Sequence, residues 1–361
     1  MTWTRYRVFL LVLFVTTGSI NTLSTKWADV IEAVGSDGVE KSFNHPFFQS
    51  LTMFLGEAMC LVLFKIMFRL YESRADGTVD SNELTKGNRK FNAFILCVPT
   101  ACDMAATSLQ NVGLNLTYAS SFQMLRGSII VFVGLLSVAF LRRRLAKREW
   151  GGIVLVMAGL SVVGVADFLY KSDDDSLDSD DVIIGDVLIV VGQVIQAIQV
   201  VVEEKFVAGM DIPPLEAVGF EGLFGLASMS LLMVPFYYIR ADRPFTEHPG
   251  DRLDDIVDAF SQMGHSWQLD VAVLGSVLSI AFYNFAGISV TKEMSATTRM
   301  VLDSIRTLVV WVFSLTVFGQ QFHWLQVLGF LLLVAGMCLY NGITFGSLIS
   351  RFKRDKVDGQ V

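Results

Sequence analysis

The sequence contains few charged residues for its length. Lys, Arg, Asp and Glu account for 17% of the 361 residues, whereas hydrophobic residues account for 53%. A soluble domain of this size covers its surface with more charge, so the scarcity excludes a soluble globular protein and indicates that lipid is the main solvent. In lipid only helix bundles and closed barrels satisfy every backbone group, and apolar runs of about 20 residues favour the helix bundle.

Motifs typical of pumps, enzymes and metal sites are also missing. No nucleotide-binding P-loop is present, which excludes ATP-driven pumping by this chain alone. The stretch His265–Asp270 matches an H-x4-D pattern of some acyltransferases, but one short match in a long chain carries little weight. We therefore expect no enzymatic activity, cofactor, metal or nucleic-acid partner. The four cysteines lie in apolar runs without metal-ligand spacing, as small core residues: Cys60, Cys97, Cys102 and Cys338.

Apolar runs bounded by charged clusters predict an all-α membrane protein with ten transmembrane helices. The first run could instead be a cleaved signal peptide, because Arg5 and Arg7 precede it. No A-x-A-like cleavage site follows, and the polar continuation 18–24 is typical of the cavity-facing end of a first transporter helix. The predicted spans are 7–25, 47–70, 91–114, 117–141, 150–170, 182–202, 217–239, 269–290, 297–318 and 325–347.

Positive charge is distributed unevenly between the loops. When the loops are assigned alternately to two sides, about 18 Lys and Arg residues fall on one side and about 6 on the other. The positive-inside rule therefore places the N-terminus and the C-terminal tail 348–361 in the cytosol. The long lumenal loop 240–268 predicts a short interfacial helix, because four apolar residues recur there at helical spacing among acidic ones: Leu253, Ile256, Val257 and Phe260.

A pattern of small and polar residues occurs twice in the chain. Its members recur at an offset of 174 to 177 residues: Gly113 with Gly287, Thr117 with Thr291, Gly152 with Gly329, Ala158 with Ala335 and Gly159 with Gly336. The recurrence predicts two related halves, 1–171 and 172–361, with five spans each. Because five is odd, the second half enters the membrane from the opposite side, which makes the two halves inverted repeats.

Two segments at equivalent places in these halves carry a family resemblance. They are 111–126, NVGLNLTYASSFQMLR, and 282–301, FYNFAGISVTKEMSATTRMV. They resemble the helix 3–4 and helix 8–9 regions of the drug/metabolite transporter superfamily and, within it, of the nucleotide-sugar-transporter-like solute carrier family 35. With 18–24, 203–206 and 221–225, the chain is similar to the F subfamily over nearly its whole length. The resemblance implies EamA-like five-helix repeats and secondary transport.

The resemblance also implies partners and a compartment. It implies a homodimer through spans 5 and 10, a mitochondrial carrier as a partner, and an endomembrane location in which the lysosomal membrane is favoured over mitochondrion or Golgi. One departure concerns the substrate. The segment Val301–Arg306 lacks the Gly-Ala-Leu-Asn-Lys motif associated with guanine-nucleotide-sugar carriers, so their specificity is not carried over. The small residues of spans 5 and 10 allow close helix approach inside a protomer or between two.

Ionisable residues inside the predicted spans are candidates for function, because a charge at membrane depth is costly unless it is paired or hydrated. Spans 4 and 9 hold comparable places, so Arg126 and Arg306 are expected to face one cavity, where two guanidiniums suit an anionic solute. In the alternative, Asp303 neutralises Arg306, and Arg126 pairs with Glu57 or Asp103. We predict that the solute contacts five residues: Gln123, Arg126, Asn284, Asp303 and Arg306.

Other polar residues in the spans have weaker assignments. A carboxyl group in a low-dielectric interior tends to keep its proton, which makes three residues candidates for proton coupling: Glu57, Asp103 and Glu221. The stripe Gln193, Gln196 and Gln199 faces either a pore or neighbouring helices. Lys292 and Arg299 flank the turn between spans 8 and 9, as a cytosolic mouth or as a topology signal. Asn115 begins a glycosylation sequon close to the membrane.

These observations favour a secondary transporter of a small, anionic metabolite, nucleotide or nucleotide-sugar-like, that works by alternating access. The bilayer and the solute are then its main partners. A non-transporting membrane protein that recruits partners through the basic loop 142–148 or the tail is the alternative hypothesis.

Overall fold

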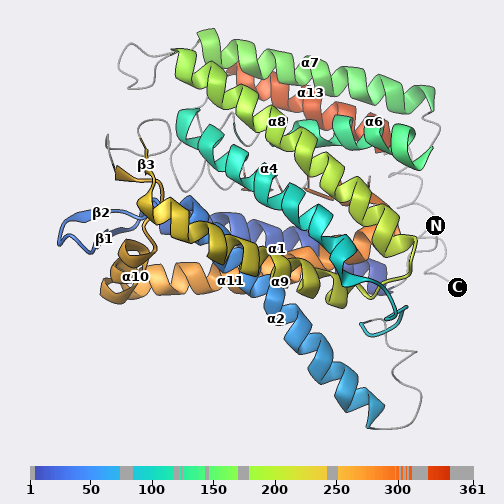
Figure 1. The fold of residues 1–361 in the computed structure, drawn as a ribbon. Helices are drawn as coiled ribbons and strands as arrows, with labels where there is room; N and C mark the ends of the chain where they lie inside the picture. Colours follow the sequence, from blue (N-terminus) through green and yellow to red (C-terminus); the bar gives the residue numbers. More distant parts are fainter. Residues whose placement is uncertain are drawn as a thin grey trace, which may run out of the picture.

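The structure is a computed structural model, and it is mostly helical (Figure 1). It describes residues 5–73, 84–117, 122, 125–142, 146–169, 179–241, 251–296, 298–300, 302–303, 306, 309–310 and 324–341. The long helices are α1 (Arg5–Val30), α2 (Pro46–Glu72), α4 (Cys97–Leu116), α6 (Ile129–Leu141), α7 (Lys147–Leu169), α8 (Ser179–Glu203), α9 (Pro214–Tyr238), α11 (Trp267–Glu293) and α13 (Trp324–Asn341).

Short elements extend or connect these helices. The 3-10 turn η1 (Ala93–Leu96) leads into α4 and η2 (Arg126–Ser128) into α6, while the π-helical turn η3 (Glu204–Ala208) continues α8. The helix α10 (Ile256–His265) precedes α11. Two antiparallel ribbons, which the sequence did not lead us to expect, complete the described elements: β1 (Glu32–Val34) with β2 (Glu40–Ser42), and β3 (Arg240–Ala241) with β4 (Asp251–Arg252).

The helical membrane-protein class predicted from composition is confirmed. Six described helices are long and apolar enough to cross a membrane by length and composition: α1, α2, α4 with η1, α8 with η3, α9 and α11. Every predicted span except 297–318 overlaps a described helix, and most of 297–318 lies outside the described residues.

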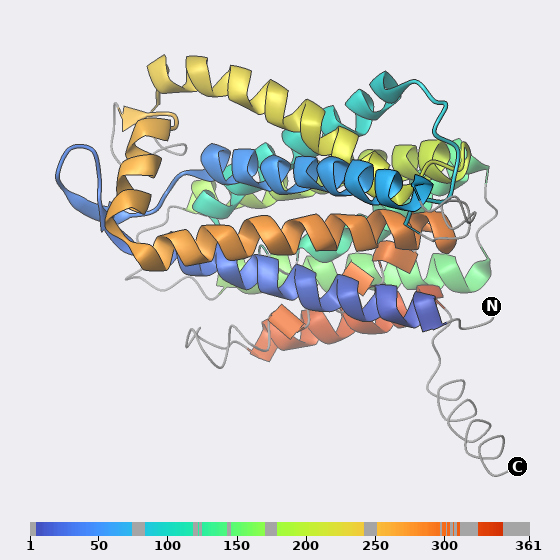
Figure 2. The same cartoon turned by 90° about the horizontal axis from the view of Figure 1, so that it is seen from below.

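The long helices pack mainly in pairs that join distant parts of the chain. α1 lies along α11, α2 along α9, α4 along α8 and α7 along α13. Figure 2 shows α1, α2 and α11 side by side, with the β1–β2 ribbon and α10 gathered at the end away from the N-terminus. Each pair joins a helix from 1–171 to one from 172–361, so the two predicted halves are interleaved.

Close contact between α2 and α9 depends on glycine. A Cβ atom at Gly222 of α9 would overlap the backbone nitrogen of Ala58 and the Cβ of Glu57 in α2. Backbone atoms cannot move aside as the end of a flexible side chain can. Glycine at this position therefore allows the two helices to approach closely beside Glu57.

We predict that Gly222→Ala lowers the free energy of unfolding by about 1–3 kcal/mol, the usual cost of overpacking. Thermal unfolding of the purified protein in detergent measures the change. Gly264→Ala in α10 is the matched control, because a Cβ there meets nothing within 4 Å and alanine favours a helix. Equal destabilisation by both changes would show that the α2–α9 contact is not the cause.

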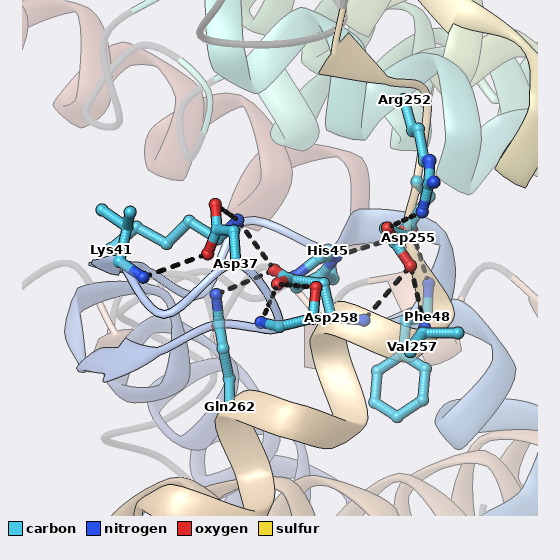
Figure 3. Close-up of polar contacts among 12 residues, drawn as sticks. Asp37, Lys41, His45, Phe48, Arg252, Asp255, Val257, Asp258 and Gln262 are labelled. Atoms are coloured by element: carbon cyan, nitrogen blue, oxygen red, sulfur yellow. Dashed lines mark hydrogen bonds and ion pairs between the residues drawn. The ribbon is translucent and has the colours of Figure 1, made fainter.

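A buried polar cluster fixes the start of α2 (Figure 3). The Asp254 Oδ2 atom accepts hydrogen bonds from the backbone amides of Phe47 and Phe48, both at 2.9 Å, and so caps the helix from a distant loop. The ring of His45 lies between two carboxylates, with Nδ1 2.8 Å from Asp254 Oδ1 and Nε2 3.2 Å from Asp258 Oδ2. The cluster thus joins the first turn of α2 to α10.

The same cluster anchors the β1–β2 ribbon. Asp258 Oδ1 accepts hydrogen bonds from the Ser36 backbone amide at 2.7 Å and its hydroxyl at 3.0 Å, and Lys41 Nζ lies 3.1 Å from Asp258 Oδ2. Burial by itself raises the pKa of Asp258, but the hydrogen bonds from Ser36 and Lys41 outweigh it and hold that pKa below the ordinary value. The ionised form of Asp258 is therefore the form that stabilises the fold.

We predict that Asp258→Asn reduces stability at neutral pH and flattens its decline in acid. Because the pKa of Asp258 is lower in the folded chain, its contribution is present above about pH 4 and is lost as the pH falls through the folded-state value. Thermal unfolding from neutral pH to about pH 3 measures this, with Glu40→Gln in exposed β2 as control. If the stability of Asp258→Asn fell in acid as steeply as that of the wild type, the ionised Asp258 would not be the stabilising form.

The helix predicted in the loop 240–268 is α10. Ala259 is fully buried, and Leu253 and Ile256 pack against the core beside α2 and α11. Val257 and Phe260 are 53% and 59% exposed, as expected for apolar residues on the lipid side of an interfacial helix.

Candidate functional site

A polar cavity of about 190 Å³ lies inside the bundle. Its wall is formed by side chains of α1, α2, α4, α6, α8 and α11, by Phe122 and Arg126, and by Arg299, Met300, Asp303 and Arg306. Elements from both predicted halves therefore meet at one site, as expected for spans 4 and 9.

The α1 side of the cavity carries the polar residues that the sequence placed there. Asn21 Nδ2 donates to the Ser276 carbonyl and hydroxyl oxygens of α11, both at 3.1 Å, and Thr25 Oγ1 lies 3.2 Å from the same hydroxyl. Helix α1 thus supplies part of the cavity wall. Its Leu10 and Phe14 are buried in the core, so the residues of the suspected signal peptide are an integrated helix in this structure.

The Arg306 guanidinium is held in the cavity wall by several contacts. Arg306 Nε lies 2.8 Å from Asp303 Oδ1, and Nη1 donates to Thr22 Oγ1 at 2.7 Å. Tyr283 also donates its hydroxyl proton to Asp303, at 2.7 Å. The Nη2 atom is buried without a hydrogen-bond partner among the described residues. Gly18 makes room for this side chain, because a Cβ at Gly18 would overlap Arg306.

Arg126 brings a second guanidinium to the cavity. Its Cζ atom lies 5.6 Å from the centroid of the Phe122 ring, within range of a cation–π interaction. It interacts electrostatically with Arg306 and Asp303, but within the described part of the chain it has no ion pair at contact distance. The predicted pairing of Asp303 with Arg306 is therefore observed, whereas the pairing of Arg126 with Glu57 or Asp103 is not.

Carboxyl groups gather on the side of the cavity formed by α2, α4 and α8. Asp103 lines the cavity, as do Thr107 and Gln199. Asn284 also lines it and donates to Glu57, which lies behind the wall. Glu203, only 1% exposed, forms an ion pair with Arg299.

The structure thus collects most of the predicted solute-binding residues at one place. Arg126, Asn284, Asp303 and Arg306 all line the cavity, and Gln123 lies outside the described residues. Among the three candidates for proton coupling, Asp103 lines the cavity, while Glu57 and Glu221 are buried and do not. The side chain of Asn115 also lies outside the description.

Arg299 was assigned to a cytosolic mouth or to a topology signal, and this was wrong. It is 7% exposed, lines the cavity and pairs with Glu203. The sequence did contain a signal, because Arg299, Asp303 and Arg306 follow the i, i+4, i+7 spacing of one helical face.

The remaining candidates are divided between structure and cavity. In the glutamine stripe, Gln196 and Gln199 line the cavity, Gln110 Nε2 donates to Gln196 at 3.3 Å, and Gln193 lies outside the cavity lining. His265 Nδ1 lies 2.7 Å from the Ser261 carbonyl, and no hydrogen bond joins it to Asp270 in the described structure.

The small residues of the predicted dimer seam are used inside the protomer. A Cβ at Gly152 of α7 would lie 2.7 Å from the Gly336 carbonyl oxygen of α13, and one at Gly159 would lie 2.8 Å from that of Gly329. These glycines therefore bring α7 against α13 within one chain. They do not by themselves support a homodimer.

Two transporter family models match the chain. The solute carrier family 35 model matches residues 13–237, and the EamA-like transporter family model matches residues 183–342. Human solute carrier family 35 member F6 is 52% identical over 357 residues, covering 99% of this chain and 94% of the relative. An uncharacterised protein of Schizosaccharomyces pombe is 31% identical over 332 residues, covering 92% and 96%.

A solved crystal structure of another protein shares the fold. It superposes with a TM-score of 0.57 at 12% identity and covers 94% of this chain and 98% of its own. At that identity the likeness concerns the fold alone. The sequence relatives, in contrast, cover nearly the full chain at high identity. The chain therefore belongs to the F subfamily of solute carrier family 35, in the drug/metabolite transporter superfamily.

Proposed function

We propose that this protein is a secondary carrier that moves a small anionic metabolite through the cavity by alternating access. Membership of solute carrier family 35 supports a solute transporter. The anionic character of the solute is inferred from a single observation, which is the pair of guanidiniums at the cavity. Arg126 has no ion pair among the described residues, and Arg306, whose Nη2 atom is buried without a hydrogen-bond partner in the described structure, also lines the cavity.

The electrostatic argument concerns the charge left over after pairing. Asp303 neutralises one of the two guanidiniums, so Arg126, Arg306 and Asp303 together leave one positive charge in a low-dielectric interior. A carboxylate or phosphate would neutralise that charge and accept hydrogen bonds from both arginines. At about 190 Å³ the cavity suits a small metabolite, and a nucleotide-sized solute would need it to widen.

The helix pairing supports two inverted halves, 1–171 and 172–361. In span numbers, the observed pairs are span 1 with 8, 3 with 6, 2 with 7 and 5 with 10. If each span is replaced by its equivalent in the other half, five places away, the pair 1–8 becomes the pair 6–3. The pairs 2–7 and 5–10 are each converted into themselves. Such a pattern is expected when a pseudo-two-fold axis relates the halves, as alternating access in this class requires.

Ion pairs at one end of the bundle support a state closed on that side. Arg7 lies 3.5 Å from Glu293, and Lys292 lies 2.7 Å from Asp211. These contacts lie at the end with the N-terminus, which the positive-inside rule assigns to the cytosol. We therefore propose a cytosol-closed carrier with both termini cytosolic. We also propose an endomembrane location, with the lysosomal membrane favoured by the family resemblance.

Counterflow in liposomes tests this function. Purified protein is reconstituted into vesicles preloaded with one unlabelled compound, and uptake of the same labelled compound is followed. The panel contains uridine and adenosine monophosphates, a nucleotide sugar, inorganic phosphate, an amino acid and a basic amphiphile. We expect accumulation of anionic compounds only. Uptake restricted to neutral or cationic compounds overturns the anionic solute, and the absence of all flux favours the interaction-protein alternative.

A further inference from the structure

The buried charges around the cavity do not balance. Three guanidiniums, Arg126, Arg299 and Arg306, and five carboxyl groups lie there within the described residues: Glu57, Asp103, Glu203, Glu221 and Asp303. Ion pairs join Arg299 to Glu203 and Arg306 to Asp303. Glu57, Asp103 and Glu221 are therefore left without a cation in contact. Three uncompensated carboxylates in so small a volume would be very costly in a membrane interior.

Glu57 is joined directly to the solute cavity. The Asn284 side chain lines the cavity and donates a hydrogen bond from Nδ2 to Glu57 Oε1. Glu57 itself is 3% exposed and lies behind the wall, with Gly222 of α9 against its Cβ. The Asn284 amide nitrogen has two N–H groups, and a ligand acceptor that draws away the one bonded to Glu57 removes the hydrogen-bond donor of Glu57.

Glu221 completes this group from α9. It is 7% exposed, and its Oε1 atom is buried without a hydrogen-bond partner in the described structure. A carboxylate oxygen in that position lacks both water and a donor, so an ionised Glu221 is poorly stabilised. The neutral acid costs less free energy at such a position than the carboxylate, because it carries no net charge.

We propose that Glu57 and Glu221 form a proton-binding site linked through Asn284 to the solute cavity, so that an anion and a proton are carried together. The titratable and charged groups that face this site come from each element packed around it: Cys60 of α2, Asp103 of α4, Glu203 of α8, and Arg299 after α11. This inference rests on the proposed transport function.

The direction of coupling follows from the hydrogen bond. An anion in the cavity competes as an acceptor for the Asn284 amide proton, and Glu57 then loses its donor. The neutral form of Glu57 becomes favoured, and one proton moves from solvent to a Glu57 carboxylate oxygen. By linkage, the protonated carrier binds the anion more tightly. Solute and proton therefore enter the same state and leave it together, which is symport.

Infrared difference spectroscopy tests the proton site without any solute. A protonated carboxyl group has a C=O stretch that is separate from those of amides and ionised carboxylates. We expect the protein at neutral pH to show such bands, and Glu57→Gln and Glu221→Gln each to remove part of them. Glu57→Asp should retain a shifted band. Asp270→Asn is the matched control, because Asp270 is exposed at the start of α11. Wild-type spectra from both Gln variants overturn the site.

Proteoliposomes with an imposed pH gradient test the coupling. For one proton per anion, accumulation of uridine monophosphate or inorganic phosphate should change about tenfold per pH unit. Glu57→Gln should remove this dependence. Anion flux that ignores the gradient overturns the coupling while the transport function stands. If neither anion is transported, both the anionic solute and the symport are wrong. The infrared spectra then decide separately whether Glu57 and Glu221 bind a proton.

Discussion

Arg126→Ala is expected to weaken the apparent affinity for a transported anion by about 10- to 100-fold while the protein remains folded. A hydrogen bond to a charged partner contributes about 1.5–3 kcal/mol, and 1.4 kcal/mol corresponds to a factor of ten. Arg126 makes no ion pair with any described residue, so its removal leaves no buried carboxylate without its partner. Concentration-dependent counterflow, with size-exclusion chromatography as the folding check, measures the effect.

Two controls sharpen this experiment. Arg126→Lys keeps the charge but loses the forked donor geometry, so an intermediate affinity is expected. Lys147→Ala removes the same charge from an exposed position at the start of α7 and should leave affinity unchanged. Full affinity in Arg126→Ala would mean that this guanidinium does not contact the solute. Loss of partner binding in the same variant, with no flux from the wild type, would instead favour the interaction protein.

The sequence identified these arginines because membranes make intramembrane charge conspicuous. Arg126, Asp303 and Arg306 stand out in apolar runs, and the repeat offset placed spans 4 and 9 in comparable positions. The i, i+3 spacing also predicted the Asp303–Arg306 pair, which the structure contains. Intramembrane charges, repeat offsets and helical spacings are local or periodic patterns, so a single sequence is enough to identify them.

Contacts between distant helices could not be predicted in the same way. Asn284 meets Glu57 across 227 positions, and Arg299 meets Glu203 across 96. No periodic pattern selects those partners from the other buried polar residues, because the choice depends on how the helix pairs are rotated against each other. The rotation depends on shape, for example where Gly222 admits the backbone of α2.

The cap at the start of α2 shows a second limit. The cap is a loop carboxylate far along the chain, and the neighbouring Asp258 binds a ribbon of three-residue strands. Strands that short give no alternation to recognise. The spacing of apolar residues in α10 did predict the helix, but not the contacts that Asp258 makes with the ribbon.

The Arg299–Glu203 ion pair is expected to have the largest single effect on stability. Arg299→Ala leaves Glu203, 1% exposed, without its cation, and breaking a buried pair in this way costs about 3–5 kcal/mol. Replacing both members with Met and Leu removes the charges together, so Arg299→Met with Glu203→Leu should recover most of the loss. Denaturant titration of the detergent-solubilised protein measures the free energy of unfolding for each variant.

Arg7 and Glu293 supply a control in the same bundle. Their side chains are 23% and 34% exposed and lie 3.5 Å apart, so water screens the pair. Arg7→Ala should therefore cost less than about 1 kcal/mol. Equal losses from Arg7→Ala and Arg299→Ala, or a double variant less stable than Arg299→Ala, would contradict the argument. The double variant Arg299→Met with Glu203→Leu could regain stability and yet fail to transport. Hydrophobic packing would then replace the contribution of the ion pair to stability, and the pair itself would be required for movement of the carrier.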